Sequence, residues 1–529
     1  MQRERQVIVI GAGIGGLATA LELAGQGQAV TVCEAADEVG GKLRQVTFEG
    51  HEGIDCGPTV FTMRWVFDEL FERAGLSLDA ALKLARLPLL ARHFWPAAAG
   101  NTGPAGHPGT KPASLDLFAD EARSVDAIAA FASPAEGRRY QAFCAQARRT
   151  FETLNTTYMA ASRPTMPQLV YRIARNRPAD LTAIHPFQTL WRALERQFHD
   201  PRLRQLFGRY ATYCGASPYQ APATLSLIAH VESCGVWLVE GGMKRLATAM
   251  AQAAQDRGAH IRTGAPVEEI LIQGTKVIGV RLRSGERLSA DAVIYNGDVN
   301  ALAQGRLGRA LADPAFAIPP RARSQSAMTW TMIGDVEGAD LAPHTVFFSD
   351  DYRAEFDDVF RRGHAPVNPT VYVHAPDRPA DAEAPHAGPE RLFALINAPA
   401  NGDTAQNDAE ELDRCQRSLL TLLKRCGASL RLHPQHLVRS SPTDFNHRFP
   451  ATGGALYGRA THGWRSSFQR RGSRTSFEGL YLAGGSVHPG PGVPMAALSG
   501  RLAAKSLLSD FRSPVQYRRA ATIGGTSTA

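Results

Sequence analysis

The stretch QVIVIGAGIGGLATALELAGQGQAVTVCEAADEVGGKLR, residues 6–44, decides the fold of this chain. Residues 7–10 are continuously apolar, which predicts a parallel strand buried on both faces. Three glycines then form G-x-G-x-x-G, and apolar residues at helical spacing follow them directly. Residues 29–33 predict a second strand. A strand, a tight turn, a helix and a second strand make a βαβ unit of the kind that binds dinucleotides.

The glycines of this unit and the acid at its end have separate predicted roles. Gly11 allows the tight turn, Gly13 lets the backbone approach a pyrophosphate, and Gly16 lets the helix pack close to the strand. The N-terminus of the helix offers free N–H groups to the phosphates. Glu34 ends the second strand, where its carboxylate can accept hydrogen bonds from ribose hydroxyls. A glycine-rich turn without a ligand is the alternative, and the flanking elements disfavour it.

A glycine pair, Gly40 and Gly41, follows the acid within a few positions and precedes Lys42 and Arg44. This pattern resembles the extension of the dinucleotide motif in many FAD-containing oxidoreductases, in which a basic side chain neutralises a phosphate. The alternative is a plain glycine turn with two solvated cations. We therefore predict FAD as the cofactor, with either Lys42 or Arg44 on a phosphate.

Composition narrows the class of protein. A chain of 529 residues with 44% hydrophobic residues can bury a large core in about two domains. The net charge of +8 fits either a solvated basic face or attraction to an anionic membrane surface. No basic run is interleaved with aromatics, so nucleic acid is not an expected partner. The 7 cysteines form no C-x-x-C pair and the 16 histidines are scattered, so we expect reduced thiols, no metal site and a cytoplasmic setting.

Membrane contact is open at this stage. The N-terminus does not read as a signal peptide, and no window of about 20 apolar residues predicts a membrane-spanning helix. Residues 164–178 combine apolar residues at helical spacing with arginines: Met166, Leu169, Val170, Arg172, Ile173, Arg175 and Arg177. A helix lying in a membrane interface and a partly buried surface helix both show this pattern. Neither interpretation is preferred from the sequence.

Three blocks of sequence resemble the bacterial carotenoid desaturases of the phytoene desaturase type. They are the opening stretch, YCGASPYQAPATLSLIAHVESCGVWLVEGGMKRLA at 213–247, and GLYLAGGSVHPGPGVPMAALSGRLAA at 479–504. They lie at the start, middle and end, so the resemblance covers essentially the whole chain. Many flavoenzymes share the first block, whereas the other two are more specific. The segment CGPTVFTMRWVFDELF, residues 56–71, with Ser486 and Met495, is similar to the branch that acts on 1-hydroxycarotenoids.

The resemblance implies an α/β fold, in which an FAD domain of the two-dinucleotide-binding Rossmann type carries an inserted α+β substrate domain. It implies that the FAD domain is discontinuous and built from residues 1–80, 235–300 and 446–511. Residues 81–234 and 301–445 would form the substrate domain with possible membrane-facing helices. Residues 96–114 read as a long connecting loop, and residues 512–529 as a flexible tail.

The resemblance also assigns residues to the cofactor by motif. The ADP half would be held by Gly11, Gly13, Gly16, Glu34, Gly41, Lys42 and Arg44, with the adenine against the backbone of Val267. The ribityl chain and the ring would lie against Gly57, Pro58, Gly484, Gly492, Val493, Pro494 and Met495.

The implied reaction is insertion of a C–C double bond into an acyclic 1-hydroxy or 1-methoxy carotenoid, such as hydroxyneurosporene, in carotenoid biosynthesis. A hydride passes from one carbon to the flavin, and a base removes a proton from the next carbon. His488 is the candidate base, and stabilisation of a turn is its alternative role. Asp55 and Glu240 are further ionisable residues that we expect in structural salt bridges.

The implied partners are a long apolar carotenoid, a membrane surface, and an electron acceptor such as oxygen or a quinone. The implied location is the cytoplasm, with peripheral attachment to the inner or photosynthetic membrane. The alternatives on the same fold are phytoene desaturation, carotenoid isomerisation and amine oxidation. A more distant one is a non-enzymatic escort protein for prenyl lipids.

Overall fold

The computed structural model describes residues 5–97, 112–181, 187–380, 388–404 and 408–512. Most of the loop predicted at 96–114 lies outside these ranges, as does the tail predicted at 512–529 after its first residue. Within the described residues, no helix has both the length and the apolar character that crossing a bilayer requires.

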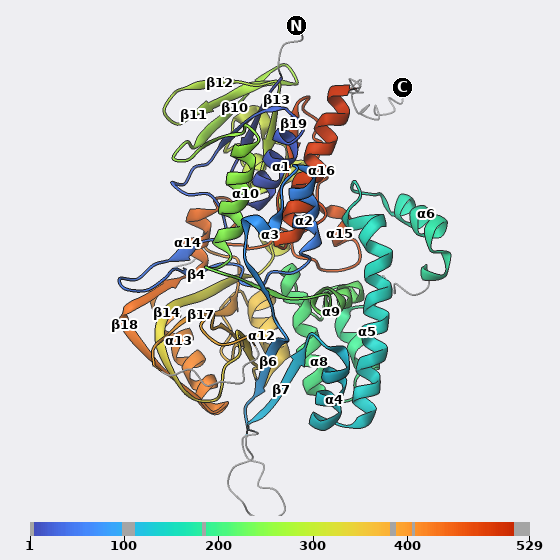
Figure 1. Ribbon diagram of the computed structural model, residues 1–529, viewed down its shortest axis with the longest axis vertical. Helices are drawn as coiled ribbons and strands as arrows, with labels where there is room; N and C mark the ends of the chain where they lie inside the picture. The colour runs from blue at the N-terminus through green and yellow to red at the C-terminus, as the bar shows by residue number, and fades with distance from the viewer. Residues whose placement is uncertain (1–4, 98–111, 182–186, 381–387, 405–407, 513–529) are drawn as a thin grey trace, which may run out of the picture.

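The first part of the fold is a five-stranded parallel sheet in the order β19-β13-β1-β2-β9. Its strands are β1 (Gln6–Ile10), β2 (Ala29–Cys33), β9 (His260–Arg262), β13 (Ala292–Tyr295) and β19 (Leu480–Leu482). They come from the start, the middle and the end of the chain. Figure 1 shows these distant segments gathered at the same end of the molecule.

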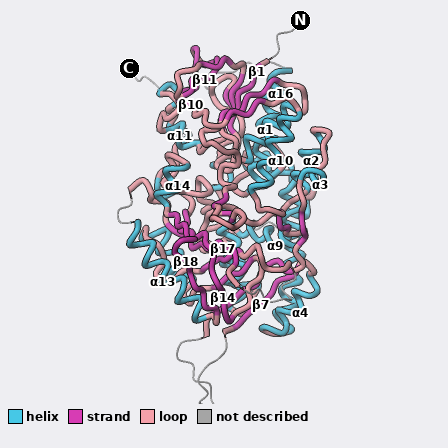
Figure 2. The backbone as a smooth tube through the Cα atoms, turned by 60° about the vertical axis from the view of Figure 1, so that its left-hand side comes forward, coloured by secondary structure: helices cyan, strands magenta, loops and turns pink. Residues whose placement is uncertain are grey.

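Each face of this sheet is covered by different elements. Helices α1 (Ile14–Ala24), α10 (Lys244–Asp256) and α16 (Val493–Arg512) lie on one side, and the antiparallel strands β10 (Val267–Gln273), β11 (Lys276–Leu282) and β12 (Arg287–Ser289) on the other. Because side chains alternate along a strand, Val7 and Val9 join the core under the helices, whereas Ile8 and Ile10 join the core under β10–β12. Figure 2 shows both coverings.

The second part is a seven-stranded mixed sheet in the order β18-β14-β17-β16-β15-β6-β7. Its strands are β6 (Leu89–Trp95), β7 (Ala113–Phe118), β14 (Ser326–Gly338), β15 (His344–Phe347), β16 (Val371–His374), β17 (Glu390–Ala398) and β18 (Ala428–Ser440). All neighbours are antiparallel except β15 and β6, which run parallel. Helix α13 (Asp408–Arg425) shares a core with one face.

The helices that follow β7 along the chain are α4 (Glu121–Phe131), α5 (Pro134–Leu154), α6 (Met166–Asn176), α7 (Leu190–Gln197), α8 (Pro201–Gly208) and α9 (Ile228–Ser233). Figure 1 shows α4, α5 and α8 beside the β6–β7 end of the second sheet, and α6 away from it, beyond the other end of α5. The short elements that connect the two sheets or flank them are β3 (Gln45–Val46), β4 (Ile54–Asp55), α2 (Trp65–Arg73), α3 (Leu78–Ala81), β5 (Leu84–Arg86), β8 (Trp237–Val239), α11 (Val299–Ala303), α12 (Tyr352–Asp357), α14 (Pro442–Arg448) and α15 (Ser466–Gln469).

The predicted α/β class with a Rossmann-type unit and a second α+β part is confirmed. The limits that we gave to the two domains stay a prediction.

Candidate cofactor site

Three glycine-rich segments meet at the carboxyl ends of the parallel strands. The first is the turn Gly11–Gly16, the second contains Gly40 and Gly41, and the third is the closing segment Gly484–Met495. Gly13 and Gly40 form an isolated bridge, so the first and second segments lie side by side. The third segment is as close, because a Cβ placed on Gly15 would lie 2.8 Å from the Cα of Gly484. Gly11 and Gly41 have φ of +95° and +60°, which side-chain-bearing residues rarely adopt. The chain is therefore bare of side chains where a ligand would cross the sheet edge.

The start of helix α1 has the features of a phosphate cradle. Gly13 is its N-cap and provides no side-chain hydrogen bond to the first turn. The amide of Leu17 is bonded back to the carbonyl of Gly13, so the amides between them are left for a ligand. A Cβ on Gly16 would lie 2.0 Å from the carbonyl oxygen of Gly11, so the helix packs directly on the turn as predicted.

Glu34 is fixed beside this cradle. Its carboxylate accepts hydrogen bonds from the amide of Ala12 at 2.6 Å and from the amide of Ala36 at 2.9 Å. Its own carbonyl accepts from the amide of Ala265 at 2.8 Å. Val267, which we predicted to meet the adenine, lies two residues further on at the start of β10. The structure thus brings Glu34 and Val267 to the same corner of the site.

Lys42 and Arg44 have different surroundings. The ammonium of Lys42 donates to the carbonyl of Leu456 and lies 5.2 Å from the centre of the Phe449 ring. Burial lowers the pKa of Lys42 to about 8, and the carboxylate of Asp298 opposes that shift. Arg44 is exposed and its guanidinium has no hydrogen-bond partner among the described residues. Arg44 is therefore the cation whose donors are still free for a phosphate.

The closing segment lies across the other end of the site. Gly484 and Gly492 have φ of +103° and +113°, and α16 begins immediately after them. The amide of Ala496 is bonded to the carbonyl of Gly492 at 2.8 Å, so Gly492, Val493, Pro494 and Met495 form the first turn. A side chain at Gly484 is excluded by the protein itself, since a Cβ there would lie 2.6 Å from Oδ1 of Asn296.

Gly57 and Pro58 follow strand β4 and lie close to the second segment. A Cβ on Gly57 would lie 2.0 Å from the carbonyl oxygen of Lys42. The next residue, Thr59, is buried and its hydroxyl lies 2.7 Å from the hydroxyl of Tyr372 in the second sheet. This loop is thus held between the two parts of the molecule.

His488 is buried in the closing segment, away from solvent. Its Nε2 lies 2.9 Å from the carbonyl oxygen of Ala161, and its ring meets the ring of Tyr158 edge-on at 4.7 Å. Burial lowers the pKa of His488 to about 4, so the imidazole is neutral at pH 7. Its Nδ1 has no hydrogen-bond partner among the described residues. The ring anchors the segment before α6, and its role as a base stays a prediction.

The two carboxylates that we expected in salt bridges differ. Glu240 pairs with Lys83 at 3.5 Å on the surface, as predicted. The prediction for Asp55 was wrong in its partner, because its carboxylate accepts from the backbone amide of Met243 at 2.7 Å and from the side chain of Gln45 at 3.1 Å. This caps helix α10, and burial raises the pKa of Asp55 to about 6.

Sequence reasoning missed two polar residues in the site. Asn296 donates to the carbonyl of Gly11 at 3.0 Å and lies among the glycines of two segments. Its position at the carboxyl end of a parallel strand was a usable signal. Arg470 is 4% exposed, and its guanidinium donates to the carbonyls of Tyr457, Arg459 and Gly485. No local signal distinguishes it from the solvated arginines beside it in the sequence.

Ser486 and Met495, which resemble the branch that acts on 1-hydroxycarotenoids, both contact other parts of the protein. The hydroxyl of Ser486 bonds the carbonyl of Gly297 and the amide of Val299, each at 3.3 Å. This attaches the closing segment to the turn after β13. Met495 packs against the hydrophobic core around α1. Neither contact carries information about a substrate.

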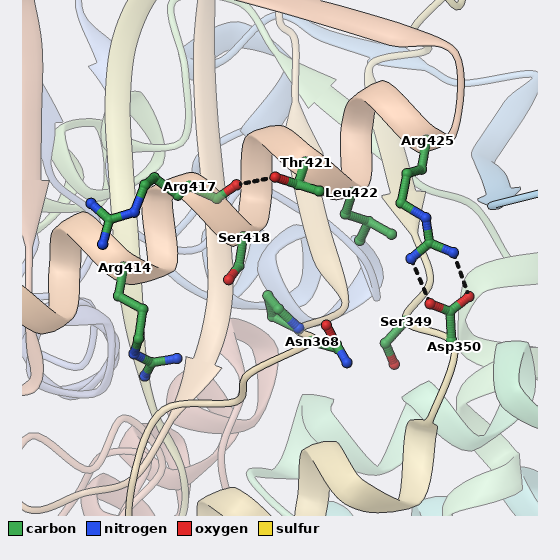
Figure 3. A pocket seen from close by; sticks show the side chains of 10 residues that line it. Ser349, Asp350, Asn368, Arg414, Arg417, Ser418, Thr421, Leu422 and Arg425 are labelled. Carbon is green, nitrogen blue, oxygen red and sulfur yellow. Dashed lines mark hydrogen bonds and ion pairs between the residues drawn. The ribbon is translucent and has the colours of Figure 1, made fainter. Parts of the chain in front are cut away.

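The cavity in Figure 3 lies elsewhere and has a different chemistry. It has a volume of about 220 Å³ and is lined by Arg414, Arg417 and Arg425 of α13. Arg425 pairs with Asp350 across it. A polar, arginine-lined space of this size does not suit a long apolar chain. The glycine segments, in contrast, have the bare backbone, free amides and fixed carboxylate that FAD requires.

Comparison with known proteins gives consistent results. The sequence profile of flavin containing amine oxidoreductases matches residues 14–508. The chain is 49% identical over 526 residues to hydroxyneurosporene desaturase of Rubrivivax gelatinosus, covering 99% of this chain and 97% of that protein. It is 42% identical over 511 residues to hydroxyneurosporene desaturase of Cereibacter sphaeroides, covering 96% and 98%. The solved structure of an oxidoreductase from Methanosarcina mazei has a TM-score of 0.58 at 17% identity, covering 95% of this chain and 100% of that one.

Proposed function

The chain belongs to the flavin containing amine oxidoreductase family, and we propose that it is an FAD-dependent desaturase of acyclic 1-hydroxy or 1-methoxy carotenoids. The observation that carries this proposal is the 49% identity over nearly the whole of both chains to a hydroxyneurosporene desaturase. Bound FAD supplies a hydride acceptor, which no amino acid side chain provides. The reaction removes a hydride from one carbon and a proton from its neighbour, leaving a C–C double bond.

The residues of the chain bind and orient the cofactor and keep water away. In the proposed arrangement, the start of α1 and Arg44 hold the phosphates, and Glu34 holds the ribose. The segment from Gly484 to Met495 covers the ring end. Burial of this segment excludes water from the place where the hydride leaves the carotenoid.

The proton requires an acceptor in the same region. His488 is the candidate that we retain, because its Nδ1 is unpartnered and the ring is neutral at pH 7. The low pKa makes it a weak base, although an allylic cation is a strong acid and needs little help to lose a proton.

Membrane contact is part of the proposal, because the carotenoid dissolves in lipid. Helix α6 and the residues after it carry exposed apolar side chains: Val170 at 45%, Tyr171 at 64%, Leu181 at 39% and Phe187 at 75%. Arg175 and Arg177 lie beside them. Apolar side chains with arginines fit the interface of an anionic bilayer. We infer that this surface rests on the membrane from which the substrate enters.

The electrons taken from the carotenoid must leave the protein. Each double bond releases two electrons, so oxygen or a quinone suits as the terminal acceptor. A quinone would dissolve in the same membrane as the substrate. It could therefore reach the protein through the membrane-docking surface that we infer on α6 and the residues after it.

Two other functions are less well supported. Amine oxidation is supported by the family to which the chain belongs. The proteins that are 49% and 42% identical to this chain over nearly its whole length, however, are hydroxyneurosporene desaturases. An escort protein for prenyl lipids has no need of an intact dinucleotide motif, and here Gly11, Gly13, Gly16 and Glu34 form a complete cradle.

The direct test is conversion by the purified, FAD-loaded protein. It would be given hydroxyneurosporene, phytoene and a simple amine in separate reactions with lipid vesicles. We expect a longer polyene from hydroxyneurosporene alone. Conversion of phytoene or of the amine, with hydroxyneurosporene untouched, would overturn the proposal.

A further inference from the structure

Arg209 is an interior cation whose donors are mostly unused. It begins the short 3-10 turn Arg209–Cys214 after helix α8 and is only partly exposed. Among the described residues, its hydrogen-bond partner is the hydroxyl of Tyr213, at 3.4 Å. A guanidinium carries five N–H donors. The unpaired donors of Arg209 are not among the fully buried, unpartnered atoms of the described residues, so they face space that water or a ligand can reach. These donors are therefore open to a ligand that brings a hydrogen-bond acceptor.

Tyr213, the hydrogen-bond partner of Arg209, is itself bonded to a buried carboxylate. Glu232 of helix α9 accepts from the hydroxyl of Tyr213 at 2.6 Å and from the hydroxyl of Tyr210 at 2.9 Å. Burial raises the pKa of Glu232, which the hydrogen bond from Tyr213 opposes. The hydroxyl of Tyr213 therefore donates a hydrogen bond to Glu232 and accepts one from Arg209. The guanidinium also lies 5.4 Å from the centre of the Tyr213 ring.

The surroundings of this cluster are aromatic. Arg209 lies close enough to Tyr352 and Tyr372 to interact with them electrostatically. Tyr352 is buried in a core with Phe207 and Phe348. A group that can bind oxygen and is surrounded by apolar and aromatic side chains suits a ligand that is apolar along its length and polar at one end.

The cluster is also connected by contacts to segments that are predicted to hold the cofactor. The 3-10 turn ends against Tyr457, because a Cβ on Gly215 would lie 2.6 Å from Cδ2 of that ring. The residue before Tyr457 is Leu456, whose carbonyl accepts from Lys42. On the other side, the hydroxyl of Tyr372 lies 2.7 Å from Thr59, which follows Gly57 and Pro58.

We propose that Arg209, oriented by Tyr213 and Glu232, binds the oxygen atom on the end of the carotenoid and selects hydroxylated or methoxylated substrates over hydrocarbons. This inference rests on the proposed function. A hydroxyl and a methoxy oxygen both offer lone pairs to the guanidinium. In the 3,4-desaturation that the resemblance implies, the oxygen on C1 is three bonds from C3, so the group that binds this oxygen has to lie near the flavin. A hydrocarbon end would displace water from these donors without replacing its hydrogen bonds, and is rejected for that reason.

The test compares two substrates that differ in one oxygen. Wild type and Arg209→Met would be assayed with hydroxyneurosporene and with neurosporene, which lacks the hydroxyl. A hydrogen bond from a charged group is typically worth roughly 10- to 100-fold, so kcat/KM for hydroxyneurosporene should fall by that factor. The value for neurosporene should stay unchanged or rise. Arg353→Met is the control, because Arg353 is an exposed arginine over another tyrosine ring, 4.9 Å from Tyr219.

A second variant gives a result even if Arg209→Met does not fold. Tyr213→Phe removes one oxygen atom and keeps the ring, and it should lower the preference by roughly tenfold. Flavin content would be measured for every variant, since both changes should leave it intact. Equal losses on both substrates, or an unchanged preference in both FAD-loaded variants, would overturn the inference. Wild type that converts neither substrate would instead refute the proposed function.

Discussion

Gly16→Ala should abolish FAD binding, because the new methyl group has nowhere to go. Its Cβ would lie 2.0 Å from the carbonyl oxygen of Gly11, about 1.3 Å short of a normal carbon–oxygen contact of about 3.3 Å. Both atoms belong to the backbone, so no side chain can move aside. Helix α1 cannot retreat either, since every residue in it is buried, and a Cβ on Gly500 of α16 would lie only 2.2 Å from the carbonyl of Gly15.

The magnitude follows from the cost of overpacking. Extra carbon in a close-packed core typically costs about 1–3 kcal/mol where neighbours can adjust, and here we expect about 3 kcal/mol or more. If the Gly11 turn absorbs the displacement, FAD affinity should fall by roughly 100-fold. The assay is flavin absorbance of the purified protein, with titration of added FAD and a thermal melt with and without it. Wild type should melt higher with FAD, and Gly16→Ala should not.

A matched control separates this effect from a general cost of alanine. Gly472 has no left-handed backbone, and its Cβ would meet Arg163 at an ordinary 3.4 Å, so Gly472→Ala should bind FAD like wild type. If Gly16→Ala kept stoichiometric FAD with unchanged affinity, the assignment of this turn as the phosphate cradle would be refuted.

Three further predictions address other parts of the molecule. Burial raises the pKa of Asp55 to about 6 from an unfolded value near 3.8, so between these pH values the folded chain binds more protons than the unfolded chain. The free energy of unfolding should therefore fall by about 3 kcal/mol as the pH rises from about 4 to about 6. Asp55→Asn should remove that slope in urea unfolding at several pH values, and an unaltered slope would contradict the assignment. His488→Gln should retain FAD and lower turnover by about tenfold, because the allylic cation loses its proton readily even to a weak base. Unchanged turnover in the FAD-loaded variant would remove His488 as the candidate base. Tyr171→Glu should weaken binding to anionic vesicles by roughly 30-fold, as expected for about 2 kcal/mol of lost burial. Ile278→Glu, at a similarly exposed apolar residue on β11, should bind like wild type, and equal effects of the two changes would argue against α6 as the docking surface.

The Rossmann unit could be predicted because its signal is local. Strand, turn and helix follow one another within residues 6–33, and each has a distinct pattern. The continuation of the same sheet could be predicted only from the resemblance, since β13 and β19 join β1 from residues far along the chain. Both are short apolar runs that would fit many sheets.

The second sheet and the interior polar residues were beyond local patterns. Strand β6 pairs in parallel with β15, so Phe94 and Phe347 lie side by side although about 250 residues separate them. Arg209 and Arg470 are indistinguishable in sequence from solvated arginines, and only tertiary packing buries them. The same is true of Asp55, whose partner is the start of a helix nearly 190 residues away.

Anaerobic mixing of the FAD-loaded protein with hydroxyneurosporene tests the central claim most directly. Without an electron acceptor, oxidation of the carotenoid must reduce the bound flavin, so the two absorbance changes should occur together. We predict one flavin bleached for each double bond formed, with recovery when oxygen or a quinone is added. A flavin that stays oxidised with hydroxyneurosporene but is bleached by a simple amine would contradict the account.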